Sequence, residues 1–143
     1  MRESYSLFDH TADAGALLSS PTREGLVRAS AAALVEILGA GPFPDEDTMT
    51  VGLLLHGRGD TPVEQLVDLL NNWLALALKR GVLPEIHGVS WDSSGIEAAV
   101  EIHERDGSRT FSTEVKAVTY HTAEVTPPKH GGEPWTARWI VDL

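Results

Sequence analysis

The first helical pattern in the chain lies between Thr22 and Gly39. Apolar residues recur there at three- and four-residue spacing, which is typical of a helix with one face against a core. Thr22 suits the N-terminal cap, because its hydroxyl can accept a hydrogen bond from a free N–H of the first turn. Gly39 suits the left-handed conformation in which many helices end. The pattern predicts a helix from Thr22 to Leu38.

A second helix is predicted between Thr61 and Gly81. Thr61 and Glu64 have the spacing of a capping box, and Pro62 fits the first helical position. Two basic residues just before Gly81 suit the negative end of the helix dipole. The apolar residues of this stretch lie nearly all round the helix, which predicts that it is mostly buried.

The rest of the chain has shorter, strand-like patterns. Seven runs have the length and composition of strands: 5–8, 15–19, 49–56, 86–91, 96–103, 115–125 and 135–141. A turn-like segment at 9–13 separates the first two runs, and a loop at 41–47 is rich in Pro, Gly and acidic residues. Helices gathered early and strands gathered late predict a single α+β domain over residues 1–143, with two helices packed on a curved, mainly antiparallel sheet.

Composition narrows the class of protein. The 143 residues have 42% hydrophobic content, which suffices for one globular core. The absence of cysteine excludes disulfides and thiolate metal sites. The sequence contains neither a signal-peptide pattern nor an apolar run of about 18 residues, so we expect a cytoplasmic protein with no membrane association.

The net charge of −10 bears on the partners of this protein. Such a charge repels a phosphate backbone, so we expect no strong direct binding to nucleic acid. Two interpretations of the acidity stay open: it keeps the protein dispersed, or it attracts a basic protein partner or a cation.

Motifs of the familiar enzyme classes are absent from the sequence. There is no phosphate-binding loop, no Gly-x-Ser-x-Gly nucleophile motif and no His-Glu-x-x-His zinc motif. The six histidines are scattered without the spacing of zinc ligands, which disfavours a histidine-based site.

Two acidic residues near the ends of the chain form a candidate metal site. If the last strand pairs near the first, Asp13 and Asp142 converge, and the terminal carboxylate of Leu143 adds a third hard oxygen ligand suited to calcium or magnesium. Alternatively, Asp13 only forms a turn and Asp142 belongs to a frayed end. The residues alone leave both interpretations open.

Three segments together resemble the archease family in order and spacing: FDHTAD at 8–13, EVKAVTYH at 114–121 and WIVDL at 139–143. The stretches 22–38 and 63–78 resemble the two helices of that family, so the resemblance covers the whole chain. Two departures are Asn71-Asn72, where the family often has Asn-Glu, and Thr122-Ala123, where it often has a bulkier apolar residue.

The resemblance implies a compact sheet with two packed helices and a non-catalytic role. Archeases activate the RtcB-type, GTP-dependent RNA ligase, promoting its guanylylation and multiple turnover in tRNA splicing or RNA repair. The resemblance also implies metal ligands at Asp13, Asp142 and the terminal carboxylate of Leu143, for a divalent ion that is most readily calcium or magnesium. Lys116 matches a position on which the family relies, and its ammonium is expected to contact the partner or a phosphate.

Lys116 lies in a run that predicts an alternating strand, with Glu114, Lys116, Val118 and Tyr120 on one face. The alternative for Lys116 is a solvated lysine at a sheet edge.

Two other functions also stay open: a stand-alone metal-dependent phosphoesterase that uses Asp13 and Asp142, and a general chaperone or adaptor. The oligomeric state is not predicted.

Overall fold

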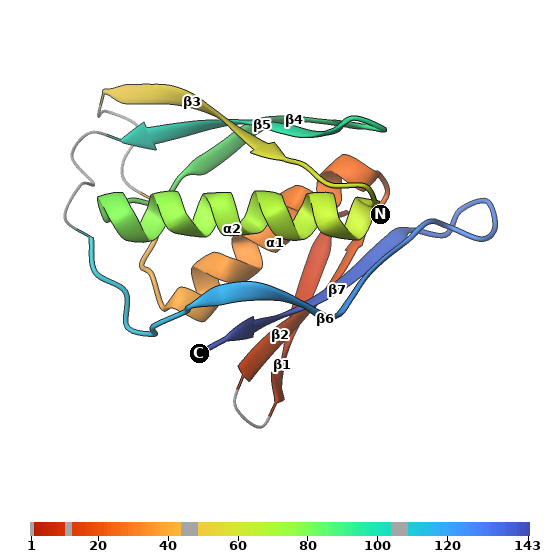
Figure 1. Cartoon of the computed structure of the whole chain (residues 1–143), viewed down its shortest axis with the longest axis horizontal. Coiled ribbons are helices and arrows are strands. Elements are labelled where there is room, and N and C mark those ends of the chain that lie inside the picture. The colour runs from red at the N-terminus through yellow and green to blue at the C-terminus, as the bar shows by residue number, and fades with distance from the viewer. Residues whose placement is uncertain (1, 11–12, 44–48, 104–108) are drawn as a thin grey trace.

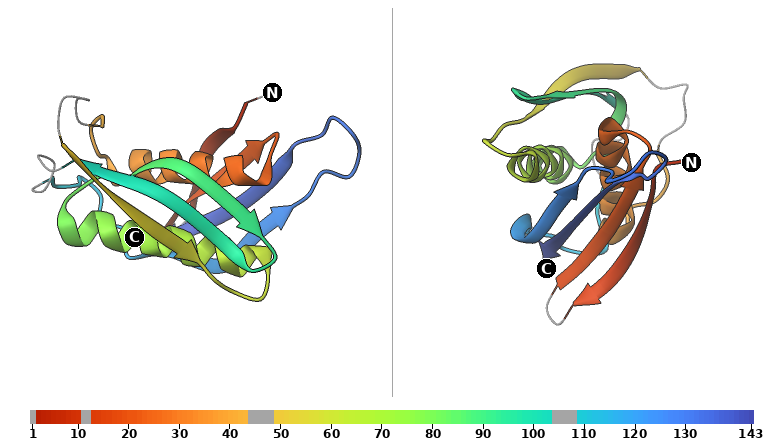
Figure 2. Two further views of the ribbon diagram at one scale, coloured as in Figure 1. Left: turned by 90° about the horizontal axis from the view of Figure 1, so that it is seen from above. Right: turned by 90° about the vertical axis from the view of Figure 1, so that its right-hand side faces the viewer.

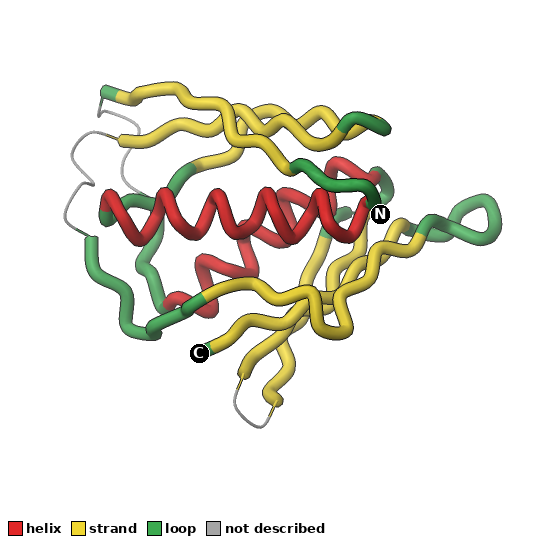
Figure 3. The backbone as a smooth tube through the Cα atoms, viewed as in Figure 1, coloured by secondary structure: helices red, strands yellow, loops and turns green. Residues whose placement is uncertain are grey.

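The computed structural model describes residues 2–10, 13–43, 49–103 and 109–143, with His10 and Asp13 described by their backbone only. In these residues, seven strands form two antiparallel sheets and two helices lie between them (Figure 1). Figure 3 shows the three layers, with strands above and below the pair of helices. The predicted α+β class with antiparallel strands is confirmed.

The strands divide unequally between the sheets. Sheet A has the order β1-β2-β7-β6, from β1 (Ser4–His10), β2 (Asp13–Ser20), β7 (Trp135–Asp142) and β6 (Ala117–Thr126). Sheet B has the order β3-β5-β4, from β3 (Thr50–Gly57), β5 (Gly95–His103) and β4 (Glu85–Asp92). The helices are α1 (Arg23–Leu38) and α2 (Pro62–Arg80). Sheet A therefore joins sequence-distant strands, whereas sheet B uses strands that follow one another around α2.

Both helices begin and end where the capping residues predict. α1 follows Thr22 and ends at Gly39, whose φ of 66° is left-handed. At the start of α2, the Thr61 hydroxyl accepts from the Glu64 N–H at 3.2 Å. The Glu64 carboxylate accepts from the N–H of Asp60 at 2.7 Å, one residue before the position that a capping box uses.

The strands form two sheets, where the sequence analysis expected the helices on one face of a single sheet. The reason lies in α2, whose apolar residues extend nearly all round it and need cover on both sides. α2 packs on β3 and β5 of sheet B and also on β6 of sheet A. α1 packs on β1, β2 and β7 of sheet A and on β4 of sheet B. The buried core residues come from both helices and from both sheets. The two views in Figure 2 show the helices between the sheets.

A buried tryptophan ties each sheet to one helix. The indole N–H of Trp139 in β7 donates to the Ser30 hydroxyl of α1 at 3.0 Å. The indole N–H of Trp91 in β4 donates to the Gln65 side-chain oxygen of α2 at 2.9 Å. All four side chains are buried, and the hydrogen bonds satisfy polar atoms that would otherwise destabilise the core.

The predicted strand at 115–125 begins later than expected, and the predicted alternation around Lys116 is wrong. β6 starts at Ala117, so Lys116 lies in the irregular segment before it. Val115 and Val118, three residues apart, are both buried. The segment from 109 to 116 leads from sheet B to sheet A, and Val115 packs in the core from this irregular crossover. Strand alternation applies only after the crossover ends.

β6 contains a second irregularity further along. Thr119 pairs with Ile140 and Glu124 with Arg138, so residues 120–123 of β6 stand opposite one residue of β7. Thr122 lies in this bulge with a φ of 56°, which is uncommon for a β-branched residue.

Parts of two predicted connections, residues 11–12 and 44–48, lie outside the described residues. In the part of the chain that is described, no helix is both long and apolar enough to cross a lipid bilayer.

Candidate functional site

Two acidic residues that are far apart in the sequence occupy one register position in sheet A. β2 and β7 pair antiparallel with Asp13 opposite Asp142. Residues directly opposite each other in such a pair have Cα atoms about 4.5–5.5 Å apart. The strand pairing on which the candidate site depends is therefore present, since the last strand pairs with the strand that Asp13 begins.

Asp142 lies on the face of sheet A that points away from the helices. Val141 is fully buried against the core, and Asp142, the next residue of β7, is exposed. Successive side chains of a strand point to opposite faces, so the carboxylate of Asp142 reaches solvent on the outer face. Leu143 is also exposed. Ligands could therefore approach this end of β7 from solvent.

A third segment reaches the same place. The backbone N–H of Lys116 donates to the carbonyl oxygen of Asp142 at 2.8 Å. The adjacent residue, Ala117, is the register partner of Asp142 on the β6 side. The Lys116 side chain is exposed, and within the described residues no ion pair or side-chain hydrogen bond restrains it. Its ammonium is thus available to an external group near Asp142.

The donor atoms at this end of sheet A suit a hard cation. Asp13 and Asp142 bring carboxylates, which are the ligands that calcium and magnesium prefer. Among the side chains that the structure describes, no group of three or more His, Asp and Glu residues has the arrangement of a metal site. The Asp13 side chain is outside that set, and the metal site stays a prediction.

A cavity of about 500 Å³ lies elsewhere on sheet A. Its lining comes from all four strands and includes Leu17, Glu124 and Arg138. The Arg138 guanidinium lies 5.0 Å from the centre of the Phe8 ring. Asp13, Lys116 and Asp142 are not among the lining residues, so the cavity and the candidate site are separate features.

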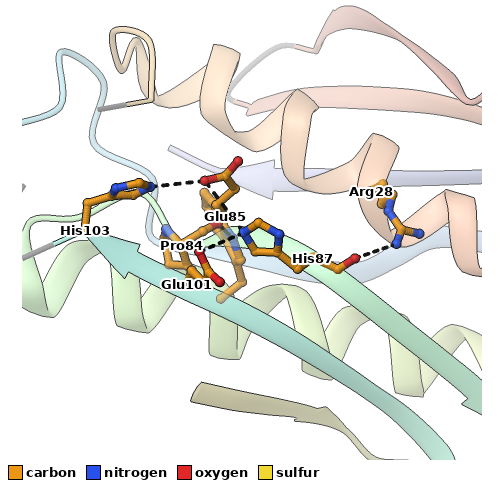
Figure 4. A network of polar contacts seen from close by, with 7 residues as sticks. Arg28, Pro84, Glu85, His87, Glu101 and His103 are labelled. Atoms are coloured by element: carbon orange, nitrogen blue, oxygen red, sulfur yellow. Dashed lines mark hydrogen bonds and ion pairs between the residues drawn. The ribbon is translucent and has the colours of Figure 1, made fainter. Parts of the chain in front are cut away.

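A polar network on sheet B, drawn in Figure 4, was not predicted from the sequence. Nε2 of His87 lies 3.1 Å from a Glu101 carboxylate oxygen, and Nε2 of His103 lies 3.1 Å from a Glu85 carboxylate oxygen. Arg28 of α1 donates to the backbone carbonyl of His87 at 2.9 Å. A Glu-x-His pattern occurs in both strands, at 85–87 and 101–103. This repeated spacing is the sequence feature from which the network could have been predicted. These side chains support the pairing of β4 with β5 and do not form a metal-holding group.

Comparison with known proteins identifies the family. The sequence matches the archease protein family (MTH1598/TM1083) over residues 5–143. The chain belongs to the archease family. The resemblance of the three motifs is thereby confirmed, and Asp13, Lys116 and Asp142 all lie within the matched region. No curated protein matches the sequence significantly.

Two solved archease-family structures have a similar fold. The solution structure of Methanobacterium thermoautotrophicum protein 1598 is 23% identical, with a TM-score of 0.68, over 97% of this chain and 98% of that one. The crystal structure of an archease described as a possible chaperone, from Thermotoga maritima, is 20% identical, with a TM-score of 0.62, over 95% of this chain and 94% of that one. At these identities the likeness establishes the fold of this archease.

Proposed function

We propose that this protein is a metal-binding, non-catalytic activator of an RtcB-type RNA ligase. It promotes guanylylation and multiple turnover of the ligase in tRNA splicing or RNA repair. Membership of the archease family supports the proposal. The observation that carries it is the register of sheet A, in which Asp13 stands opposite Asp142 while Lys116 hydrogen-bonds to the Asp142 backbone.

The residues at this end of sheet A fit a divalent metal. Two carboxylates at one register position provide hard oxygen donors on adjacent strands. The terminal carboxylate of Leu143 would add a third, directly after Asp142. Calcium or magnesium is the expected ion, because the three proposed donors are all carboxylates.

Charge explains how such a protein could assist a ligase. A metal on oxygen ligands can neutralise phosphate charge during nucleotidyl transfer. The net charge of −10 would speed the encounter with a basic, RNA-handling enzyme while disfavouring direct RNA binding. The exposed position of Asp142 and Lys116 would let both meet a partner surface.

Lys116 has a role in this proposal that differs from that of the carboxylates. Its exposed ammonium can pair with a phosphate or an acidic group of the ligase without taking part in metal binding. We expect Lys116→Ala to change the free energy of unfolding by less than about 0.5 kcal/mol, because it removes only an exposed charge. We expect the same variant to reduce stimulation of the ligase.

Ligation of RNA ends by an RtcB-type ligase, with and without this protein, tests the proposal. Asp13→Asn, Asp142→Asn and Lys116→Ala should each lower multiple turnover and ligase guanylylation without lowering the melting temperature appreciably. Lys129→Ala, an exposed lysine in the β6–β7 connection, is the matched control and should leave stimulation unchanged. Parental stimulation by all three variants would overturn the proposal.

Two other functions predict activity that needs no ligase, each in a separate assay. A stand-alone phosphoesterase would hydrolyse phosphoesters with metal and without a ligase. A chaperone, the role suggested in the description of the Thermotoga maritima archease, would protect unrelated proteins from aggregation without needing Asp13 or Asp142.

A further inference from the structure

Four edge strands bound the two sheets, and they differ in how their free backbone groups are covered. An uncovered edge invites pairing with another chain, so proteins normally protect edges with charges, bulges or capping side chains. At the β4 edge, Arg23 and Arg28 of α1 donate to the backbone carbonyls of Trp91 and His87, and a bulge lies between Ile86 and Gly88. This edge is well protected.

The β6 edge is protected in a similar way. Asn71 of α2 binds both backbone groups of Val118: it donates to the carbonyl at 2.9 Å and accepts from the N–H at 2.9 Å. The bulge at residues 120–123 interrupts the strand beyond it. The β1 edge carries Asp9 and packs beside α1.

The β3 edge has little of this protection among the described residues. β3 pairs with β5 without a register shift over its eight residues. No Lys, Arg, Asp, Glu, proline or bulge occurs from Met49 to Gly57, and the one titratable side chain, His56, lies 3.8 Å from Glu97 of β5. Two of its apolar side chains are strongly exposed, Leu54 at 60% and Val51 at 42%, and so is Met49, just before the strand, at 74%. Figure 2 shows β3 at the open margin of its sheet.

The direction of the free backbone groups can be deduced from one hydrogen bond. The side-chain amide of Asn72 in α2 donates to the carbonyl of His56 at 2.8 Å, so this carbonyl points away from β5. Along an antiparallel strand, alternate residues direct both N–H and C=O away from the partner strand. Leu54 and Gly52 therefore present their backbone groups at the open edge.

The exposed side chain and an adjacent hollow are complementary. Leu54 projects from the outer face of sheet B as the most exposed leucine. Two residues earlier, a Cβ built on Gly52 would meet nothing within 4 Å. A shallow cavity of about 300 Å³ lies there, with Gly52, Ala99 and Glu101 in its lining. An antiparallel second β3 centred on Leu53 would bring its Leu54 opposite Gly52.

We propose that β3 is the interface of a two-fold symmetric dimer, in which β3 of one copy pairs antiparallel with β3 of a second copy and the two copies of sheet B become one continuous sheet. Residues 52 and 54 exchange backbone hydrogen bonds, and each Leu54 fills the hollow at Gly52 of the other copy. A second copy fits because the uncharged strand places no like charges opposite each other, although each chain carries −10. The contact is small, so the dimer is weak and concentration-dependent.

Cross-linking tests the interface and its register. The chain has no cysteine, so Leu53→Cys introduces a single thiol. At the two-fold axis, two copies of residue 53 form a non-hydrogen-bonded pair with Cα atoms about 4.5 Å apart, which is within disulfide range. Leu55→Cys is the matched control on the same face, because its two copies would lie about 13 Å apart. Mild oxidation should give covalent dimer with Leu53→Cys and not with Leu55→Cys.

Two further variants separate dimerisation from folding in sedimentation velocity across a concentration series. Leu54→Lys should weaken the dimer by at least about tenfold, because it removes the apolar side chain and adds like charges across the axis. Gly52→Val should weaken it similarly while the melting temperature is unchanged or raised, because a β-branched residue suits a strand and has room there. Leu17→Lys, at a leucine that is 49% exposed in β2, is the control and should leave dimerisation unchanged.

The outcomes that overturn the dimer are equally definite. A parent protein that stays monomeric at about 1 mM, and gives no Leu53→Cys cross-link, has no such interface. A dimer that persists unchanged in Leu54→Lys and Gly52→Val uses another surface. The dimer interface lies on sheet B, away from Asp13 and Asp142, so either result leaves the proposed ligase activation to its own test.

Discussion

The two sheets of this archease cover the same pair of helices but are assembled in different ways. Sheet B uses β3, β4 and β5, which follow one another around α2. Sheet A places β7 between β2 and β6, so strands from the two ends of the sequence become neighbours. The candidate metal residues lie at the junction of β2 with β7, whereas the uncharged edge strand belongs to sheet B. Thus the candidate metal site depends on pairing between strands that are far apart in the sequence. The proposed dimer interface belongs to a sheet whose strands are close in the sequence.

The adjacent residues Asn71 and Asn72 illustrate how α2 serves both sheets. Asn71 binds the backbone of β6 in sheet A through two hydrogen bonds, and Asn72 binds the backbone of β3 in sheet B through one. A helix between two sheets can fix an edge strand on either side with neighbouring side chains. The Asn71-Asn72 pair, a departure from the usual family pattern, has a structural explanation in these contacts.

The largest expected effect concerns the tryptophans that tie each sheet to a helix. Trp139→Ala in sheet A and Trp91→Ala in sheet B should each destabilise the protein by about 3–5 kcal/mol, because both side chains are buried. Urea unfolding followed by circular dichroism measures this. If the two sheets share one core, each variant unfolds in a single transition at a lower urea concentration than the parent. Two separate transitions would show that the sheets unfold independently.

A smaller difference is expected between the two asparagines. Asn71→Ala should cost about 1–3 kcal/mol, because it leaves both backbone groups of Val118 without their partner. Asn72→Ala should cost less, about 0.5–1.5 kcal/mol, because Asn72 is exposed and makes one such bond. Hydrogen exchange at the Val118 N–H gives a local check. Equal effects of the two substitutions would contradict the assignment of Asn71 as the stronger edge cap.

Features that depend on near neighbours could be predicted from the sequence. Thr22, Gly39 and Thr61 mark helix ends because capping acts within one turn of the helix. The spacing of strands and turns after α2 predicted an antiparallel α+β fold for the same reason. The pairing of β2 with β7 was stated only as a condition, since no local pattern specifies which strands become neighbours.

Features that depend on the third dimension were missed or wrong. The strands divide into two sheets because α2 is covered on both sides, by sheet B and by sheet A. The periodicity of α2 predicted only that the helix is mostly buried. The apparent alternation of charged and apolar residues placed Lys116 in a strand, but Lys116 and the buried Val115 precede β6, in the crossover. The contact of His103 with Glu85 joins two strands, and the Glu-x-His spacing that could have suggested it was overlooked.

The smallest expected effect is a pH dependence that arises from one residue of sheet B, Asp92. The N–H and hydroxyl of Ser94 donate to the Asp92 carboxylate at 2.8 and 2.6 Å in the β4–β5 turn, and the hydroxyl bond is the larger cause of a lowered pKa for Asp92. A lowered folded-state pKa gives stability that is present above the unfolded value, about 3.9, and is lost as the pH falls through the folded value. The free energy of unfolding of Asp92→Asn should therefore fall less steeply than that of the parent as the pH is lowered below about 4. An equally steep fall in the variant would contradict this.

Calorimetric titration of the protein with calcium, and separately with magnesium, tests the central claim about sheet A most directly. The account predicts binding of one of these ions to the parent, its loss in both Asp13→Asn and Asp142→Asn, and its retention in Glu97→Gln, an exposed acid of sheet B. Without metal, the two Asp variants should melt at or above the parental temperature, because each removes one of two like charges at a shared register position. Neither ion binding the parent, or binding that survives both Asp substitutions, would contradict the account.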